Sequence, residues 1–408
     1  MSRETTPNMS IDTSKIARGL IDRSYYISEN IYEEEQKRIF GKTWVFVAHR
    51  SEFRKPGDFR TLDIAGQPVL AVLGDDSRVR VFYNTCSHRG PLVATEPRGN
   101  KASFRCMYHH WEYDRQGRLA MVPREEGYAG AFRKEDNGLI ELPRVEIFEG
   151  LIFAAITEDV PSFADFLGVA APDLAYLETT GQGALEVLGC YDFLYKGNWK
   201  LLYENTLDDY HAQYLHAGAY KMPEYEYGQA YASQALGGRG RSPEESNRQT
   251  RAVGMHSVLE WRDAPETLKY QTERIRHLHV AIFPSFLGLY HPGWDVTNYR
   301  ILRPEGIGMT RVHNYVLGPA NMDPEGKRAL AERFHYSYGP GGRIGLDDVR
   351  VFEHCQRGLR ANGRDLLLAR GIDKPGDQGG AADEHNIRNF WSTWSRYMSA
   401  PDVKGGAQ

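Results

Sequence analysis

Two short cysteine and histidine pairs constrain this chain of 408 residues more than any other feature. The first pair is Cys86-Ser-His88, and the second, a short stretch further on, is Cys106-Met-Tyr-His109. Two thiolates and two imidazoles can hold a zinc ion, or a [2Fe-2S] cluster in which histidines replace two cysteines on one iron. Each pair is short enough to occupy the tip of one loop. The fold must therefore bring two loop tips together.

The residues that follow each pair favour the iron-sulfur interpretation. Arg89-Gly90 follows the first pair and Trp111 follows the second. This resembles the Rieske motif, Cys-x-His-Arg-Gly followed by Cys-x-x-His-x-Trp. One departure is His110, where the family usually has glycine; we interpret it as a non-ligand in a loop that tolerates a side chain. The resemblance implies four cluster ligands, Cys86, His88, Cys106 and His109.

A structural zinc site remains the alternative at this stage. Zinc sites more often open with Cys-x-x-Cys, and zinc chemistry does not require Arg89, Gly90 or Trp111. Cys190 and Cys355 have no such neighbours, and we expect them to be buried free thiols. With histidines on one iron, the reduction potential rises to roughly −150 to +300 mV, so such a cluster accepts electrons readily.

A second group of ligand-type residues lies about a hundred residues further on, around His211 and His216. Non-haem iron oxygenases bind iron with two histidines and one carboxylate, which leaves positions open for dioxygen. Histidines five residues apart on an ideal helix point about 140° apart. For both to reach one ion, a π-bulge or a helix end must lie between them.

The surrounding residues carry a second resemblance. Asn198-Trp199-Lys200, followed by Asp208-x-Tyr-His211-x4-His216, is similar to the large (alpha) subunits of Rieske ring-hydroxylating oxygenases. The resemblance implies a third iron ligand in the segment Asp348-x4-Glu-x-x-Gln356, and we choose Asp348. The preceding residue, Asp347, stays open as an alternative.

Asp208 precedes His211 by three residues, so on a helix the two side chains would share a face. The carboxylate would then accept the second N–H of the imidazole. The resemblance adds that this acid contacts a cluster histidine, here His109, across a subunit boundary in a head-to-tail homotrimer. Asp208 is therefore our candidate electron bridge, and a plain helix-capping acid is the alternative.

The chain changes character twice along its length. Residues 43–157 show short alternating apolar strands separated by turns, which predicts a small antiparallel β domain. Helical patterns flank it, from Tyr32 to Phe40 and from Glu384 to Met398, and residues 278–283 and 310–317 are predicted as strands. We expect an α+β fold, in which an all-β Rieske domain (43–157) is inserted into a helix-grip-like catalytic domain with a large antiparallel sheet (1–42 and 158–408).

The substrate is constrained only weakly. A glycine- and arginine-rich loop, roughly 228–251, favours an aromatic acid, although a solvated loop is the simpler interpretation. The pocket is expected in the region of four aromatic residues, each of which is more often plain core. These residues are Phe283, Phe286, Tyr290 and Trp294.

Several classes of function are disfavoured by composition. No apolar run is long enough to span a membrane and the N-terminus lacks a signal-peptide core, so we expect a cytoplasmic protein. A net charge of −4 argues against nucleic acid as the main partner. Four cysteines, two of them assigned to a cluster, leave no disulfide framework.

The family resemblance implies a terminal oxygenase that hydroxylates an aromatic substrate with O2. Electrons would come from NAD(P)H through a separate reductase, with or without a ferredoxin, because the chain has no Gly-x-Gly-x-x-Gly fingerprint after a strand. A small beta subunit is possible. A Rieske monooxygenase or O-demethylase shares every metal ligand and remains the alternative, whereas a stand-alone Rieske electron carrier would need only the first site.

Overall fold

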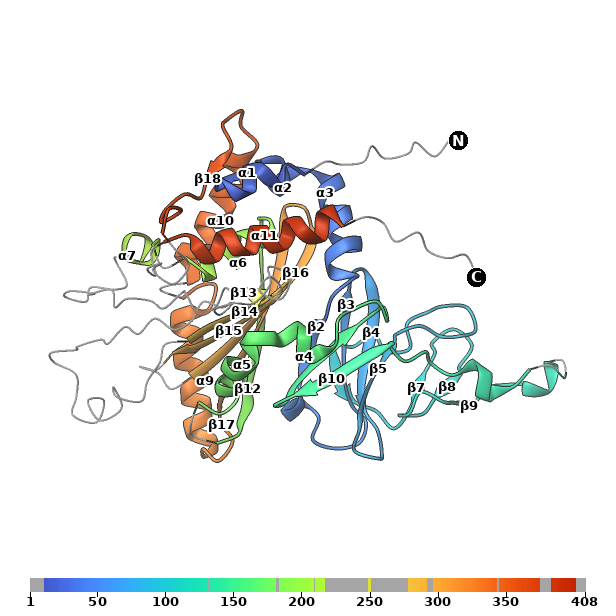
Figure 1. The fold of residues 1–408 in the computed structure, drawn as a ribbon. Coiled ribbons are helices and arrows are strands. Elements are labelled where there is room, and N and C mark those ends of the chain that lie inside the picture. Colours follow the sequence, from blue (N-terminus) through green and yellow to red (C-terminus); the bar gives the residue numbers. More distant parts are fainter. Residues whose placement is uncertain are drawn as a thin grey trace, which may run out of the picture. The chain divides into compact units, whose positions relative to one another are not determined.

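One unit of the chain interrupts the other in sequence (Figure 1). In the computed structural model, residues Phe40–Phe163 form the inserted unit, while Met1–Ile39 and Ala164–Gln408 form the larger one. The insertion predicted from the sequence is therefore confirmed. The structure describes residues 11–128, 130, 132–180, 183–208, 210–216, 249–250, 278–291, 296–342, 345–374 and 383–400.

The inserted unit consists of short antiparallel strands, as the alternating apolar pattern predicts. They form sheets in the orders β5-β4-β3-β6, β10-β11-β2 and β7-β8-β9. Buried valines such as Val47, Val69 and Val81 join the first two sheets into one core. The strands are β2 (Val45–His49), β3 (Asp58–Ile64), β4 (Gln67–Leu73), β5 (Val79–Tyr83), β6 (Arg98–Asn100), β7 (Phe104–Arg105), β8 (Glu112–Tyr113), β9 (Leu119–Met121), β10 (Arg144–Phe148) and β11 (Leu151–Ala155).

The larger unit contains a six-stranded antiparallel sheet in the order β12-β17-β16-β15-β14-β13. The strands predicted over 278–283 and 310–317 are two of its members. The sheet consists of β12 (Leu185–Tyr195), β13 (Gln249–Thr250), β14 (Leu278–Ile282), β15 (Phe286–His291), β16 (Val296–Gly306) and β17 (Met309–Pro319). A short pair, β1 (Leu20–Ile21) and β18 (Leu366–Leu367), lies apart from this sheet.

Helices cover the sheet of the larger unit (Figure 1). None of the described helices has the length and apolar content needed to cross a bilayer. The helices are α1 (Thr13–Ala17), α2 (Ser24–Ile27), α3 (Glu29–Glu35), α4 (Phe163–Leu167), α5 (Ala171–Leu177), α6 (Trp199–Thr206), α7 (Ala212–Leu215), α9 (Pro324–Tyr338), α10 (Gly345–Leu359) and α11 (His385–Ser399).

The helix predicted over Tyr32–Phe40 is present as α3, which continues into a π-helical segment, Gln36–Phe40. The predicted C-terminal helix is α11. Two residues of its aromatic stripe, Phe390 and Trp394, are fully buried, and Tyr397 stacks on Phe283 with ring centroids 5.3 Å apart. This stripe forms core within the larger unit.

A buried polar cluster fixes the first turn of α6. Lys200 Nζ lies 2.5 Å from Glu35 Oε1, and both side chains are fully buried. The indoles of Trp199 and Trp394 donate to the same carboxylate at 2.9 and 2.7 Å. A buried charge is tolerated when it is paired and hydrogen-bonded, and Glu35 meets both conditions. The Asn-Trp-Lys motif thus anchors α6 to α3 and α11.

Candidate metal centres

Two loops of matching geometry carry the cysteine and histidine pairs. In the first, Cys86 N donates to Pro91 O (2.8 Å) and Gly90 N donates to Cys86 O (2.9 Å). In the second, Cys106 N donates to Trp111 O (2.8 Å) and His110 N donates to Cys106 O (3.0 Å). Each loop is therefore closed by the same two backbone hydrogen bonds, which hold the cysteine at the start and the histidine near the tip.

The two loops bring donor atoms together that fit a Rieske cluster. Cys86 and Cys106 are buried, with 3% and 1% exposure. The rings of His88 and His109 lie 4.5 Å apart, and the buried Nδ1 atom of each ring has no hydrogen-bond partner among the described residues. Burying a polar atom without a partner is unfavourable, and a metal ion bound there would remove that cost. Burial also lowers the pKa of His88, which favours the neutral imidazole that a metal requires.

Aromatic residues surround the first centre. Tyr113 Oη lies 3.2 Å from Cys86 Sγ and accepts a hydrogen bond from Ser87 N at 3.0 Å. Burial raises the pKa of Tyr113 far above its ordinary value, so the phenol stays protonated and can donate to a thiolate. Trp111 stacks on the ring of His88 at 4.9 Å with an interplanar angle of 10°. The tryptophan of the motif thus orients one candidate ligand.

His110 is exposed, as expected of a side chain that the loop tolerates, and its backbone is left-handed, with φ of +59°, like that of Gly90 at +83°. That conformation is the physical reason for glycine at this position. Cys190 and Cys355 form no disulfide among the described residues, but the expectation that both are buried was wrong, since Cys190 is intermediate and Cys355 is exposed. Cys355 lies off the buried stripe of α10 that contains Phe352 and Gln356.

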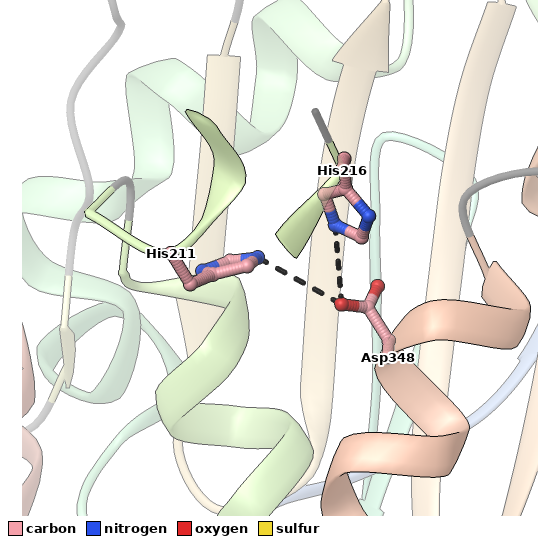
Figure 2. Close-up of side chains that lie close together, drawn as sticks. All are labelled: His211, His216 and Asp348. Carbon is pink, nitrogen blue, oxygen red and sulfur yellow. Dashed lines mark ion pairs between the residues drawn. The ribbon is translucent and has the colours of Figure 1, made fainter. Parts of the chain in front are cut away.

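The second centre forms where α6 ends (Figure 2). His211 and His216 are the residues that flank the single-turn helix α7, in which Leu215 N donates to His211 O at 2.8 Å and His216 N donates to Ala212 O at 3.1 Å. The irregularity expected between the two histidines therefore lies before His211 instead, because α6 ends at Thr206. Asp348, in the first turn of α10, completes the group, and one ligand atom from each of the three residues lies within 4.8 Å of the others.

Both histidines turn the same ring nitrogen toward Asp348. Its Oδ1 lies 3.2 Å from His216 Nε2 and 3.8 Å from His211 Nε2, and only 10% of its side chain is exposed. Asp347 contacts the opposite nitrogen, with Oδ2 3.5 Å from His216 Nδ1, and its side chain is 41% exposed. The geometry thus places Asp348 between the rings and Asp347 outside them. Two histidines and one carboxylate are the donor set that Fe(II) oxygenases use.

Asp208 contacts His211 without sharing a helix with it. α6 ends at Thr206, so the expected helical arrangement of Asp208 and His211 was wrong. Asp208 Oδ2 nevertheless lies 3.4 Å from His211 Nδ1, while its Oδ1 accepts from Tyr210 N at 2.8 Å. Burial lowers the pKa of His211, but the neighbouring Asp208 and Asp348 outweigh it and raise the pKa overall. This acidic environment suits a cation.

One residue beside this centre was not singled out from the sequence. Asn205 Nδ2 lies 3.0 Å from His211 Nε2 and 3.3 Å from Asp348 Oδ1. Its position just before the histidine segment, in the last turn of α6, could have indicated from the sequence that it lies near His211.

Buried hydrogen bonds hold α10 in place against α6. Gln356 Oε1 accepts from Asn198 N at 2.9 Å, and its Nε2 donates to Tyr26 O at 3.1 Å. Glu353 accepts from Lys196 N at 3.2 Å. The acid and the glutamine that follow Asp348 in the motif therefore fix the helix that presents Asp348 to the histidines.

The predicted pocket residues lie largely in the core. Phe283, Phe286 and Tyr290 have 0%, 1% and 3% exposure. Trp294 and the arginines of the predicted loop lie outside the described residues. The aromatic-acid preference is therefore untested by this geometry.

Comparison with known proteins assigns the chain to a family. Residues 171–400 match the model for the ring hydroxylating alpha subunit (catalytic domain), and residues 43–143 match the Rieske [2Fe-2S] domain. The chain belongs to the ring-hydroxylating oxygenase alpha-subunit family. It is similar to the terminal oxygenase component subunit alpha 2 of terephthalate 1,2-dioxygenase from Comamonas sp, with 30% identity over 90% of this chain and 92% of that protein.

Two further comparisons agree. The alpha subunit of 2-aminobenzenesulfonate 2,3-dioxygenase from Alcaligenes sp is 32% identical over 93% of each chain. The crystal structure of a naphthalene 1,2-dioxygenase variant bound to phenanthrene superposes with a TM-score of 0.75 and 26% identity, covering 94% of this chain and 93% of that one. This oxygenase alpha subunit therefore uses a Rieske [2Fe-2S] cluster and a mononuclear iron, and the zinc alternative is wrong.

Proposed function

We propose that Cys86, Cys106, His88 and His109 hold the [2Fe-2S] cluster of this oxygenase, and that His211, His216 and Asp348 hold its mononuclear iron. The convergence of His211, His216 and Asp348 within 4.8 Å carries the second assignment. The unpartnered Nδ1 atoms of His88 and His109 support the first. The corresponding domains would comprise residues 43–157 for the cluster and 1–42 with 158–408 for the iron.

The two ligand sets would give the two metal centres different roles in the reaction. When bound, the cluster supplies electrons one at a time and the iron supplies open positions at which O2 is activated. His211, His216 and Asp348 would hold that iron, since one ligand atom of each lies within 4.8 Å of the others. Asp208 Oδ2 lies 3.4 Å from His211 Nδ1, close enough to orient the ring electrostatically.

Asp208 is proposed as the electron bridge, in contact with His109 of the partner subunit in a head-to-tail homotrimer. Its place beside His211 supports the role, because one carboxylate oxygen faces the iron ligand and the other is fixed by Tyr210 N. NAD(P)H would supply electrons through a separate reductase, with or without a ferredoxin. A small beta subunit remains compatible with this arrangement.

The proposed substrate is an aromatic acid. Two relatives of this chain are named for terephthalate and 2-aminobenzenesulfonate, both anionic aromatic compounds. Dihydroxylation is the proposed outcome. Monohydroxylation or O-demethylation uses the same ligands, so analysis of the products with aromatic acids distinguishes these reactions.

The metal content of matched variants tests the ligand assignment. Wild-type protein purified without oxygen should contain about three irons and two acid-labile sulfides per chain. Asp348→Asn should lose about one iron and keep both sulfides, because a neutral amide is a poorer ligand for Fe(II). The neighbouring Asp347→Asn should keep all three irons. Iron loss in the Asp347 variant alone would assign the third ligand to Asp347 instead.

A further inference from the structure

Arg370, in the turn that follows β18, connects the start of α11 with the segment that carries Asp208 and His211. We propose that Arg370 is a positioning residue, which holds Tyr210 and through it the carboxylate of Asp208. This inference rests on the proposed role of Asp208 as the electron bridge.

The backbone of Arg370 is fixed from the α11 side. Its N–H donates to Glu384 Oε2 at 2.9 Å, and its carbonyl accepts from Arg388 Nη1 at 2.7 Å and from Glu384 N at 3.2 Å. Arg388 Nη1 also bonds to Leu368 O at 3.2 Å. Both peptide groups of Arg370 are therefore held by the beginning of a 15-residue helix whose stripe of aromatic side chains is buried.

The side chain of Arg370 contacts the ring of Tyr210. Its guanidinium carbon lies 3.7 Å from the centre of the Tyr210 ring, which is face-to-face stacking distance. A planar guanidinium stacks on an aromatic ring, whereas an ammonium acts as a point charge. Tyr210 N donates to Asp208 Oδ1 at 2.8 Å, and Asp208 Oδ2 lies 3.4 Å from His211 Nδ1. A continuous set of contacts thus runs from Arg370 to the iron-ligand ring.

The segment needs such support because no long helix holds it. α6 ends at Thr206, and α7 has only four residues. The last backbone bonds of α6 run from Leu207 N to Glu204 O and from Asp208 N to Asn205 O. Beyond them, Tyr210 offers its ring to Arg370 and its N–H to Asp208. Loss of the stacking would free Tyr210, and the Asp208 carboxylate would lose its fixed orientation.

The test measures the rate of electron transfer from the prereduced cluster to the mononuclear iron in a single turnover. The absorbance of the cluster reports this rate. The iron and sulfide contents of each variant are measured as well. Arg370→Gln should retain both metal centres and the cluster potential but transfer electrons about tenfold to a hundredfold more slowly. Arg370→Lys should be slowed as well, because it keeps the charge and loses the planar group. Arg396→Gln removes a guanidinium 5.6 Å from the Tyr397 ring at the far end of α11, and it should transfer at the wild-type rate.

Variants of Tyr210 test the same contact between Arg370 and Tyr210. Tyr210→Phe keeps the ring and should behave as wild type, while Tyr210→Leu should be as slow as Arg370→Gln. The double variant, Arg370→Gln with Tyr210→Leu, should be no slower than either single variant, because the two substitutions remove the same interaction. A wild-type rate in Arg370→Gln, or multiplicative slowing in the double variant, would overturn the inference. A wild-type rate in Asp208→Asn would instead refute the bridge itself, so the two failures are distinguishable.

Discussion

Tyr113 is placed to donate a hydrogen bond to the sulfur of Cys86, a proposed cluster ligand. Its hydroxyl lies 3.2 Å from Cys86 Sγ, and the buried environment keeps it protonated. A donor to a ligand sulfur stabilises the more negative, reduced cluster, so it raises the reduction potential. Tyr108, by contrast, is exposed and its hydroxyl lies 3.5 Å from the guanidinium of Arg89.

Tyr113→Phe should therefore lower the reduction potential. If this hydrogen bond stabilises the reduced cluster by about 1 kcal/mol more than the oxidised cluster, its loss lowers the potential of the one-electron couple by about 40 mV. Protein-film voltammetry or a spectroscopic redox titration measures the shift. Tyr108→Phe is the matched control and should leave the potential unchanged; an equal shift in both variants would show that the bond to Cys86 is not responsible.

At the scale of elements, α6 is the helix on which the iron centre depends. Its first turn is anchored through Glu35 and its last turn leads into the histidine segment. Near the end of α6, Glu204 Oε1 accepts from Tyr26 Oη on α2 (2.6 Å) and from Trp391 Nε1 on α11 (2.7 Å). Burial raises the pKa of Glu204 to about 7, although both hydrogen bonds oppose the rise. One carboxyl group thus joins three helices and titrates near neutral pH.

This junction predicts a pH-dependent stability. The pKa of Glu204 is higher in the folded protein than its ordinary value of 4.5, so the folded state binds more protons between these values. Its contribution is complete below about pH 4.5 and is lost as the pH rises through 7, at most about 3 kcal/mol. Glu204→Gln keeps an acceptor oxygen without titrating. The difference in thermal midpoint between variant and wild type should therefore grow over this range in favour of the variant.

Glu34 provides the control for that measurement. It pairs with Arg38 at 2.6 Å and Lys37 at 3.0 Å, and although burial opposes them, these cations lower the pKa of Glu34 overall. Its stabilising effect is therefore present at higher pH and is lost as the pH falls through its lowered pKa. Glu34→Gln should leave the loss of stability between pH 4.5 and 7 in place. If Glu204→Gln also leaves it in place, another group is responsible.

At the scale of the whole molecule, the candidate cluster ligands belong to the inserted unit and the candidate iron ligands to the larger unit. Function requires electrons to pass between them. The proposed path from Asp208 to His109 of the partner subunit makes the working unit an assembly, because each iron would be served by the cluster of a neighbour.

Mixed assemblies test this path directly. Asp208→Asn keeps its cluster but breaks the bridge at its own iron, whereas Cys86→Ala keeps the bridge but lacks the cluster. Each variant alone should be inactive. Co-expressed in equal amounts, they should recover about a quarter of wild-type activity, since random mixing in a closed ring places a working donor beside a working acceptor at that frequency. No recovery in proven mixed trimers would show that electrons pass within one chain.

Much of the site was predictable because its chemistry is local in the sequence. Cys86-Ser-His88 and Cys106-Met-Tyr-His109 each occupy one loop, and backbone bonds within each loop set its shape. The alternating strands and the C-terminal helix, α11, followed from periodicity, which depends on neighbouring residues alone. Spacing alone placed an irregularity between His211 and His216, whereas the chain leaves regular helix before His211, where α6 ends at Thr206.

Contacts between distant segments were decided by the tertiary structure alone. Sequence spacing could not separate Asp347 from Asp348, because the choice depends on how Gln356 and Asn198 set the rotation of α10 against α6. The approach of Asn205 to His211 and the stacking of Arg370 on Tyr210 likewise arise where segments meet. Local patterns therefore determined which ligands this protein offers, while packing determined their orientation and the residues that hold them, because orientation depends on the side chains of every element that meets at the site.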